Sequence, residues 1–393
     1  MSYTQITNDE ELRVFCDRHS RAKQIALDTE FVAEHTYRPV LCLVQVAADE
    51  ELALIDPLTI KDMLPFWVLL AKEGHETVVH AGRGEVEFCL HAVGRPPANL
   101  FDVQTGAGLV GIEYPAGYGN LITKLLGKKP NKEETRTDWR RRPLSALQIE
   151  YALDDIRFLP AIREVIGARL EDLGRVEWLQ EEMASWLEEI QQAVSSERWR
   201  RVSGNSGLSA RSLGIVRELW RWRESEAERR NCPVRRVLRD DLIVELARRQ
   251  TADLKRIRAL RGLERGDLQR QLHRLSAAIQ RGLELPEGEL PTAARVECGP
   301  QLSVLGQFLF AALGNICRQA SLSPGLVGGP NDVRELIAYR AGQASARRPP
   351  RLAKGWRAGV IGRVFDDLLA GKIVVRVVDP ASDSPLALEP GRS

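Results

Sequence analysis

Two acidic residues interrupt an otherwise apolar run, and their spacing is compatible with a metal site. The run Ile25–Val32 contains Asp28 and Glu30, two positions apart. If the run is a strand, these side chains project from the same face of the sheet. Partly buried carboxylates on one face repel each other unless a cation lies between them. Magnesium, which prefers oxygen ligands, would relieve that repulsion.

A second set of candidates follows later in the chain. Tyr151 and Asp155 lie four positions apart, so they share one face of the helix expected from Ser145 onward. Glu85 stands at the start of another expected helix. Two metals held by carboxylates provide the activated water and the charge neutralisation that phosphodiester cleavage needs. A phenol such as Tyr151 can position or deprotonate that water.

Each signal also has an ordinary structural explanation. A single Asp-x-Glu at a strand end is usually a solvated or capping pair, and tyrosine is a common core residue. The joint occurrence of Asp28, Glu30, Glu85, Tyr151 and Asp155, in this order, favours a catalytic site.

The elements that must position these residues alternate between strands and helices over residues 1–175. An α/β domain with a mixed sheet and flanking helices is therefore expected. Ser145 is a plausible helix cap, and Pro160 should kink or break the helix that follows. The expected strands are Ile25–Val32, Leu41–Ala47, Leu52–Ile55 and Thr77–Ala81, with a turn at Asp49 and Glu50.

The remainder of the chain has a helical pattern, which predicts all-α bundle domains. The expected segments are a helical connector over 176–204, a bundle over 205–287, a second helical domain over 295–380, and a disordered tail over 381–393. The tail is assigned from its proline and serine content.

The composition limits the class of protein and its compartment. The 393 residues carry 56 basic and 54 acidic side chains, so a polyanion partner has to be argued from local charge. The start lacks a signal peptide, and no apolar run is long enough for a membrane helix. Six scattered cysteines without a CxxC pair disfavour zinc and disulfides. We expect a soluble cytoplasmic protein with no membrane partner and no obligate protein partner.

Five segments together resemble the ribonuclease D branch of the DEDD exonucleases, in its tyrosine-bearing subgroup. They are LDTEF, VVHAG followed by an acid, LFDVQTGAGLVG, TRTDWRRRPLS and YALDD, and they span most of residues 20–170. The resemblance implies a ribonuclease-H-like fold and two divalent ions, magnesium or manganese. It also implies that Asp28 bridges both metals, while Glu30 and Asp155 hold the metal that activates water.

The same resemblance assigns the remaining site residues and exposes one departure. Tyr151 matches the tyrosine that orients or deprotonates the water, and Asp102 matches an acid that we interpret as structural support. The family normally has aspartate where this chain has Glu85, whose extra methylene changes its reach toward the second metal. Glu87 should turn away from Glu85. Glu85 is therefore a metal ligand or merely a neighbour of the site.

Substrate contacts are predicted at Phe31, Gln45, His80, Arg136 and Arg140. Phe31 lies against the terminal nucleotide or is an ordinary core residue, and His80 shapes the site or is structural. Gln45 needs a hydrogen-bond partner if it is buried in its apolar strand. The arginines, with Arg141 and Arg142, hold phosphates or belong to a solvated loop.

The segment with WRESEA, VLRDD and LIVELA resembles the helicase-and-RNase-D C-terminal (HRDC) domain, which usually binds nucleic acid. Several of its cations either track phosphates or pair with neighbouring acids. These cations are Arg235, Arg236, Arg239, Lys255, Arg256, Arg258 and Arg261. Residues 295–380 are a second, divergent HRDC copy or a module that closes a ring around the nuclease.

Taken together, these features predict a metal-dependent 3′–5′ exoribonuclease. It would trim structured RNA, most plausibly tRNA precursors at their 3′ ends, and release 5′-monophosphates. Two alternatives remain at this point. One is a DNA-directed repair exonuclease, because the same metal chemistry serves both polymers. The other is a nucleic-acid-binding scaffold whose catalytic site has decayed at Glu85.

Overall fold

The computed structural model describes residues 2–129, 137–291, 300–342 and 349–391. The chain forms two compact units. The first unit contains residues 1–30, 43–190 and 296–393, and the second contains residues 31–42 and 191–295. The predicted phosphate contact Arg136 lies outside the described residues.

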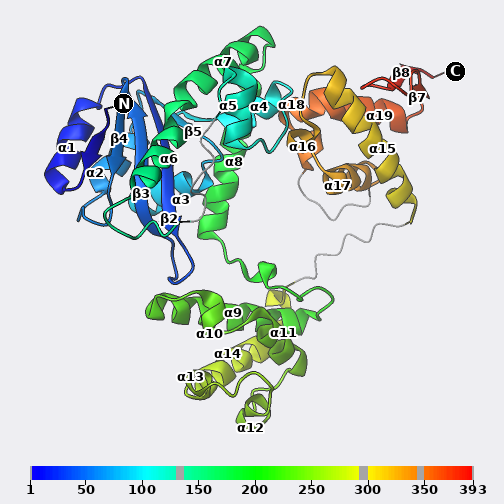
Figure 1. Ribbon diagram of the computed structural model, residues 1–393. Coiled ribbons are helices and arrows are strands. Elements are labelled where there is room, and N and C mark those ends of the chain that lie inside the picture. The colour runs from blue at the N-terminus through cyan, green and yellow to red at the C-terminus, as the bar shows by residue number, and fades with distance from the viewer. Residues whose placement is uncertain (1, 130–136, 292–299, 343–348, 392–393) are drawn as a thin grey trace. The chain divides into compact units, whose positions relative to one another are not determined.

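The first unit is built on a six-stranded mixed sheet, which confirms the predicted α/β class (Figure 1). The strands are β1 (Thr4–Ile6), β2 (Gln24–Val32), β3 (Val40–Ala48), β4 (Glu51–Ile55), β5 (Glu76–Val79) and β6 (Leu100–Asp102), in the order β1-β4-β3-β2-β5-β6. Strands β3 and β4 are antiparallel, whereas β5 is parallel to both β2 and β6. The predicted turn at Asp49 and Glu50 is confirmed, since both residues have positive φ.

Helices cover this sheet, and two of their predicted boundaries are confirmed. Helix α6 begins with a capping box between Ser145 and Gln148. It ends at Arg157, and α7 starts at Leu159 with Pro160 in its first turn, where a missing N–H is tolerated. The helices of this part are α1 (Asp9–Arg18), α2 (Leu64–Ala71), α3 (Arg83–Val93), α4 (Val103–Leu109), α5 (Tyr118–Leu126), α6 (Ala146–Arg157), α7 (Leu159–Asp172) and α8 (Val176–Ser195).

The second unit is a helical bundle, as its apolar periodicity predicts. Helices α9 and α14 pack against each other over a core of leucine, isoleucine and valine side chains. Its elements are η1 (Trp199–Arg201), α9 (Ala210–Arg230), α10 (Val234–Val237), α11 (Asp240–Arg249), α12 (Leu254–Arg258), α13 (Gly266–Gln269), α14 (Leu272–Glu284) and η2 (Glu287–Glu289). Within the described ranges, no helix has the length and apolar character needed to cross a membrane.

The C-terminal segment is helical and ends in a hairpin. Its elements are α15 (Pro300–Gln319), α16 (Pro324–Val327), α17 (Pro330–Arg340), η3 (Arg351–Ala353), α18 (Gly355–Arg357), η4 (Ala358–Gly362), α19 (Arg363–Leu369), β7 (Ile373–Val377) and β8 (Leu386–Pro390). The prediction of a disordered tail is wrong for residues 386–390, because β8 pairs antiparallel with β7. A ladder of backbone hydrogen bonds outweighs the local proline and serine content.

A buried ion cluster joins this C-terminal segment to α8 within the first unit. Glu182 accepts hydrogen bonds from the guanidinium groups of Arg357 (2.9 Å) and Arg351 (2.8 Å). The rings of Trp178 and Trp356 stack beside it at 5.1 Å. Burial raises the pKa of Glu182, but the two arginines outweigh it and hold the pKa below its usual value. The cluster is therefore an ionised, fully paired contact.

The first prediction concerns this cluster. Replacing Glu182 with alanine leaves Arg357 buried without its counter-charge, because Arg357 is only 6% exposed. We expect Glu182→Ala to lower the free energy of unfolding of the first unit by about 3–5 kcal/mol, measured by urea denaturation. Glu188→Ala, an exposed position on the same helix, is the control and should change it by less than about 0.5 kcal/mol. Equal effects of the two changes would contradict a buried, paired Glu182.

Candidate active site

The predicted acids come together at one end of the sheet. Register places Ala26 of β2 beside Val78 of β5, so Asp28 and His80 continue the two strands at the same end. Helix α3 starts just after β5 and carries Glu85 in its first turn. Helix α6 brings Tyr151 and Asp155 from further along the chain. Parallel strands thus deliver residues distant in sequence to one sheet edge.

The acids perturb one another strongly, which shows that they share one site. Burial, followed by Glu85, Asp155 and Glu30, raises the pKa of Asp28 well above its usual value. Burial, with Asp155 and Glu85 next, raises the pKa of Glu30 to about 8. None of the largest influences on either group is a cation. The structure therefore groups Asp28, Glu30, Glu85 and Asp155, and among the described residues no positive side chain is one of the main influences on Asp28 or Glu30.

Two hydroxyl groups hold two of these carboxylates. The Tyr151 hydroxyl donates to Asp155 and lowers its pKa, but burial dominates and raises that pKa to about 7. The Thr29 hydroxyl donates to Oε1 of Glu85 at 2.5 Å. Glu85 is only 5% exposed, and burial raises its pKa as well. Glu85 is thus fixed beside β2, the strand that carries Asp28 and Glu30.

Asp102 supports the site, as the sequence analysis predicts. Its carboxylate accepts hydrogen bonds from the backbone N–H groups of Gly82 (3.1 Å), Gln104 (2.8 Å) and Thr105 (3.1 Å). Asp102 therefore caps α4 and also fixes the turn that leads into α3. Glu87 pairs with Arg83 at 2.9 Å on the surface, which confirms that it turns away from Glu85.

The site fits a divalent cation through the chemistry of its donors. In the part of the chain that the structure describes, no three acidic, histidine or cysteine residues lie in a ready-made metal cage. The four carboxylates nevertheless offer only oxygen donors, which magnesium and manganese prefer. Their unbalanced negative charge is what a divalent cation would neutralise. Asp28, Glu30 and Asp155 are the candidate ligands, and Glu85 is the candidate for a second ion.

The predicted substrate contacts Phe31, His80 and Gln45 differ in their exposure and in their contacts. Phe31 follows Glu30 directly and is 42% exposed, so it is accessible to a nucleotide. Nε2 of His80 lies 2.8 Å from the carbonyl oxygen of Ala116, so His80 shapes the site by holding the loop before α5. Gln45 is fully buried and its amide has no partner, so the prediction that it contacts substrate is wrong. The strand β3 that carries it lies inside the sheet, between β2 and β4.

The arginine run before α6 is mostly engaged within the protein. Arg140 donates to both carboxylate oxygens of Asp138, at 2.9 and 3.1 Å. Arg142 donates to Oδ1 of the buried Asp56 at 2.8 Å and to the carbonyl oxygen of Trp139 at 2.8 Å. The phosphate-binding interpretation of Arg142 is therefore wrong, because the side chain anchors its loop on the sheet domain. Among the described arginines of the run, residues 140–142, the side chain of Arg141 is the most exposed, at 85%.

Two residues near the acids escaped prediction. Thr29 lies between the two acids of the strand, but only the fold brings its hydroxyl to Glu85. The Tyr118 hydroxyl is buried without a hydrogen-bond partner of normal geometry. Burial, and then Asp155, raise the pKa of Tyr118. The sequence gives no periodic or spacing signal that would connect Tyr118 to Asp155.

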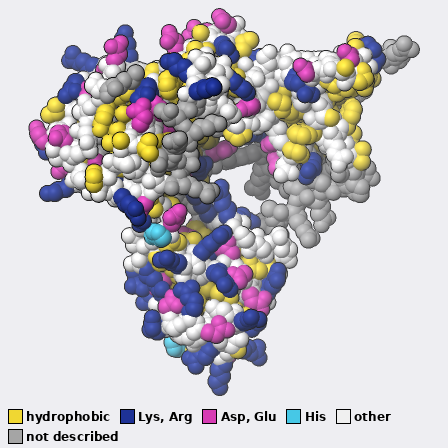
Figure 2. Space-filling model, in the orientation of Figure 1, with side chains coloured by type: hydrophobic (Ala, Val, Ile, Leu, Met, Phe, Trp, Pro, Cys, Tyr) yellow, Lys and Arg dark blue, Asp and Glu magenta, His cyan; other side chains and the backbone are white. Residues whose placement is uncertain are grey.

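In the second unit, acidic and basic side chains intermingle over the surface (Figure 2). Some predicted phosphate contacts pair with acids, as Arg239 does with Asp241 at 3.0 Å. The exposed cations Lys255, Arg256 and Arg258 on α12 form no ion pair within the described residues. Helix α12 therefore presents three exposed cations of the predicted HRDC segment to solvent.

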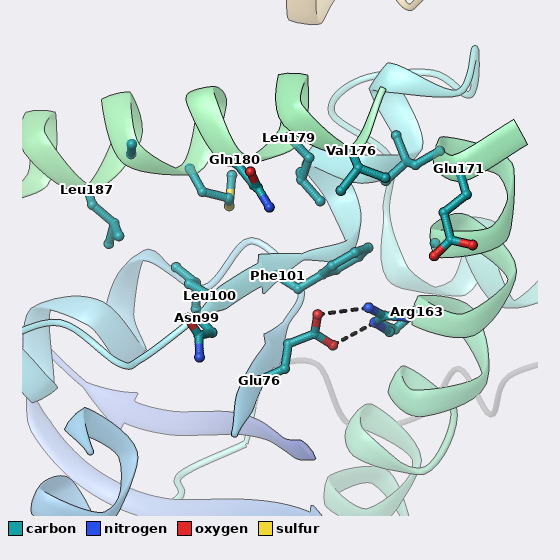
Figure 3. A pocket seen from close by; sticks show the side chains of 14 residues that line it. Glu76, Asn99, Leu100, Phe101, Arg163, Glu171, Val176, Leu179, Gln180 and Leu187 are labelled. Atoms are coloured by element: carbon teal, nitrogen blue, oxygen red, sulfur yellow. Dashed lines mark hydrogen bonds and ion pairs between the residues drawn. The ribbon is translucent and has the colours of Figure 1, made fainter. Parts of the chain in front are cut away.

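A cavity of about 330 Å³ lies elsewhere in the first unit, between α8 and the sheet edge (Figure 3). Its wall includes Leu100, Phe101, Leu179 and the ion pair of Arg163 with Glu76, whose two bonds measure 2.6 and 2.9 Å. Glu76 begins β5, whereas His80 follows the other end of that strand. The cavity is therefore separate from the acids, and the partly buried ion pair on its wall is already neutral.

Comparisons with known proteins agree with this geometry. A family model described as "3'-5' exonuclease" matches residues 3–171, and one described as "HRDC domain" matches residues 212–279. Ribonuclease D of Gluconacetobacter diazotrophicus is 34% identical, covering 93% of this chain and 92% of the relative. That of Zymomonas mobilis is 34% identical, covering 95% of each. A crystal structure of Escherichia coli RNase D, "an exoribonuclease involved in structured RNA processing", matches with TM-score 0.82 and 28% identity over 94% of this chain and 99% of that chain.

The second prediction follows from the raised pKa values. Folded Glu30 and Asp155 titrate at about 8 and about 7, above their ordinary values of 4.5 and 3.8. Between these values the folded protein binds more protons than the unfolded chain, so without metal its stability falls as pH rises. A divalent cation removes the repulsion that causes this fall. We expect the increase in Tm caused by magnesium to be larger at pH about 8 than at pH about 5, measured by thermal unfolding against EDTA.

The control for this measurement is Asp28→Asn. It removes one of the repelling charges, so in EDTA at the higher pH it should unfold at a higher temperature than the native protein. It should also lose most of the magnesium effect. A magnesium effect that is independent of both pH and Asp28 would mean that the ion binds elsewhere.

Proposed function

The chain belongs to the ribonuclease D family and is a 3′–5′ exoribonuclease, and from this premise we propose that it trims structured RNA. The proposed substrates are tRNA precursors with unpaired 3′ ends, and the proposed products are 5′-monophosphates. The observation that carries the proposal is the grouping of Asp28, Glu30, Glu85 and Asp155 around a hydroxyl from Tyr151. That set of groups matches what hydrolysis of a phosphodiester requires.

We propose that two divalent ions, magnesium or manganese, serve this site. Asp28, Glu30 and Asp155 would hold them, with Glu85 as the candidate ligand for the second ion. Ions bound there would supply an activated water and neutralise charge on the phosphoryl and leaving oxygens. Glu85 retains the negative charge of the family aspartate, and its bond to Thr29 keeps it in the site. This argues against a decayed site.

Tyr151 is proposed to orient the attacking water. Its pKa is raised, first by burial and then by the charges of Asp155 and Glu30, so the phenol stays neutral near pH 7. A neutral hydroxyl can donate or accept a hydrogen bond, but it is a poor base. The hydroxyl already contacts Asp155, and this places it beside a proposed ligand of the water-activating ion.

The HRDC domain is a nucleic-acid-binding domain, and we propose that it holds the body of the RNA. The exposed cations Lys255, Arg256 and Arg258 on α12, with Arg261 just after it, support contacts with the phosphate backbone. Such contacts make binding dependent on salt. The helical domain predicted over residues 295–380 remains a proposed second HRDC copy. The five described cysteines are free thiols, which supports a reducing compartment such as the cytoplasm.

The third prediction tests the reaction. A tRNA precursor with a 3′ extension should shorten one nucleotide at a time in magnesium or manganese, followed by gel electrophoresis and detection of 5′-monophosphates. EDTA and Asp28→Asn should each stop the shortening, because EDTA removes the ions and the substitution removes a proposed ligand. Faster digestion of a matched DNA would overturn the RNA assignment. Binding of RNA without any shortening would show that the site has lost its chemistry.

The fourth prediction isolates Tyr151. Tyr151→Phe removes the hydroxyl but leaves the carboxylates, so kcat should fall by at least about 100-fold while KM changes little. The magnesium-induced rise in Tm should remain, because no carboxylate is lost. Loss of that rise would instead make Tyr151 a support of the metal site, and an unchanged kcat would exclude it from catalysis.

A further inference from the structure

The loop between β2 and β3 belongs structurally to the HRDC unit. Residues 31–42, which include the last two residues of β2 and the first three of β3, group with residues 191–295, whereas the rest of both strands belongs to the first unit. The Tyr37 ring packs against the apolar core of the HRDC bundle. The loop is therefore built into the surface of the bundle, and is not a free connection.

Three polar contacts fix the loop on α9. The backbone N–H of Tyr37 donates to Oδ1 of Asn231 at 3.2 Å, and its hydroxyl donates to Glu224 at 3.2 Å. Arg38 pairs with Glu228 at 3.3 Å on the surface. Because surface pairs contribute little, the two bonds of Tyr37 and the packing of its ring dominate the contact.

Asn231 serves two purposes in this contact. It ends α9 in the left-handed conformation, with φ of 44°, which asparagine tolerates better than most residues. In that position its side chain is free of the helix and meets the Tyr37 N–H. Glycine would preserve the helix end and remove only the acceptor, so the contact can be broken without disturbing the bundle.

The loop is also continuous with the catalytic strand. Glu30 and Phe31 are neighbours in β2, and Tyr37 lies seven positions after Glu30. Even fully extended, that length of chain spans at most about 25 Å. A hydrogen bond between Thr36 and the carbonyl oxygen of Arg38, at 2.6 Å, tightens the loop just where it meets α9. A short, ordered tether thus runs from the proposed metal ligands to the HRDC bundle.

We propose that Tyr37 and Asn231 form a latch that determines specificity for structured RNA. The latch couples the HRDC domain, which holds the RNA body, to the strand that carries Asp28 and Glu30. An RNA with a folded body has to bind the HRDC domain and the nuclease site at the same time. A short single strand has to bind only the nuclease site. This inference rests on the proposed function of the site and of the HRDC domain.

The test uses the full-length protein with the paired change Tyr37→Phe and Asn231→Gly. Phenylalanine keeps the packed ring, and glycine keeps the left-handed helix end. Gln250→Gly is the matched control, because Gln250 also ends a helix of this bundle at positive φ and makes no contact with the loop. Two substrates are compared in magnesium: an RNA hairpin with a 3′ single-stranded extension, and a five-nucleotide single-stranded RNA.

We expect kcat/KM on the hairpin to fall by at least about fivefold, mainly through KM, with hydrolysis of the short RNA unchanged. Hydrogen exchange of the peptide that contains the Tyr37 N–H should accelerate in the paired variant and not in Gln250→Gly. The exchange measurement is independent of activity. A native protein that degrades neither RNA overturns the proposed function, whereas the exchange result still reports on the latch.

Two outcomes would overturn the inference itself. An equal fall on both substrates would mean that the loop merely supports the carboxylates, and unchanged kcat/KM on both would mean that the contact has no role in specificity. Unchanged exchange of the Tyr37 N–H would mean that the bond to Asn231 does not hold the loop in solution.

Discussion

Repulsion between buried carboxylates is the constraint on which the rest of the structure depends. Asp28, Glu30 and Asp155 are gathered together, and within the described residues no cation is a main influence on their pKa values; such an arrangement is unfavourable unless the surrounding fold enforces it. The enforcement is spread over several elements. Two acids are fixed by the strand β2, a third by the capped helix α6, and the turn before α3 by the hydrogen bonds of Asp102. Favourable interactions elsewhere in the fold offset the free-energy cost of this site. Such compensation is usual for active sites.

The unit that carries the chemistry and the unit that carries the HRDC bundle are interleaved along the chain. Residues 31–42, from the end of β2 to the start of β3, group with the bundle, so the connection between these two strands belongs to the other unit. The boundary predicted from the sequence at residue 175 marks the end of the expected nuclease domain. The structure instead divides the chain into two units according to which residues pack together. This difference explains why helix α8, expected to be a connector, contributes to the core of the first unit through Leu179 and Met183.

Local patterns predicted the features that depend on neighbours in sequence. The Asp-x-Glu pair, the Tyr151 and Asp155 spacing, the Ser145 cap and the break at Pro160 all depend on periods of two or four residues. Features that depend on tertiary contacts could not be predicted from the sequence. Arg142 donates a hydrogen bond to Asp56, which lies 86 positions away in the sequence, and Thr29 donates one to Glu85, which lies 56 positions away. Gln45 is a polar residue in an apolar strand, which suggested a functional role, yet its side chain is fully buried in the folded protein.

The Glu182 cluster bears on how the protein can be divided. An acid that needs two arginines more than 160 positions away cannot be treated as part of an autonomous amino-terminal enzyme. A nuclease fragment cut from this chain before residue 300 would keep Glu182 and lose Arg351 and Arg357, exposing an unpaired acid beside a bare tryptophan face. A fragment that ends between α8 and residue 300 would therefore be destabilised and would expose apolar surface. Loss of activity in such a fragment would say nothing about RNA binding.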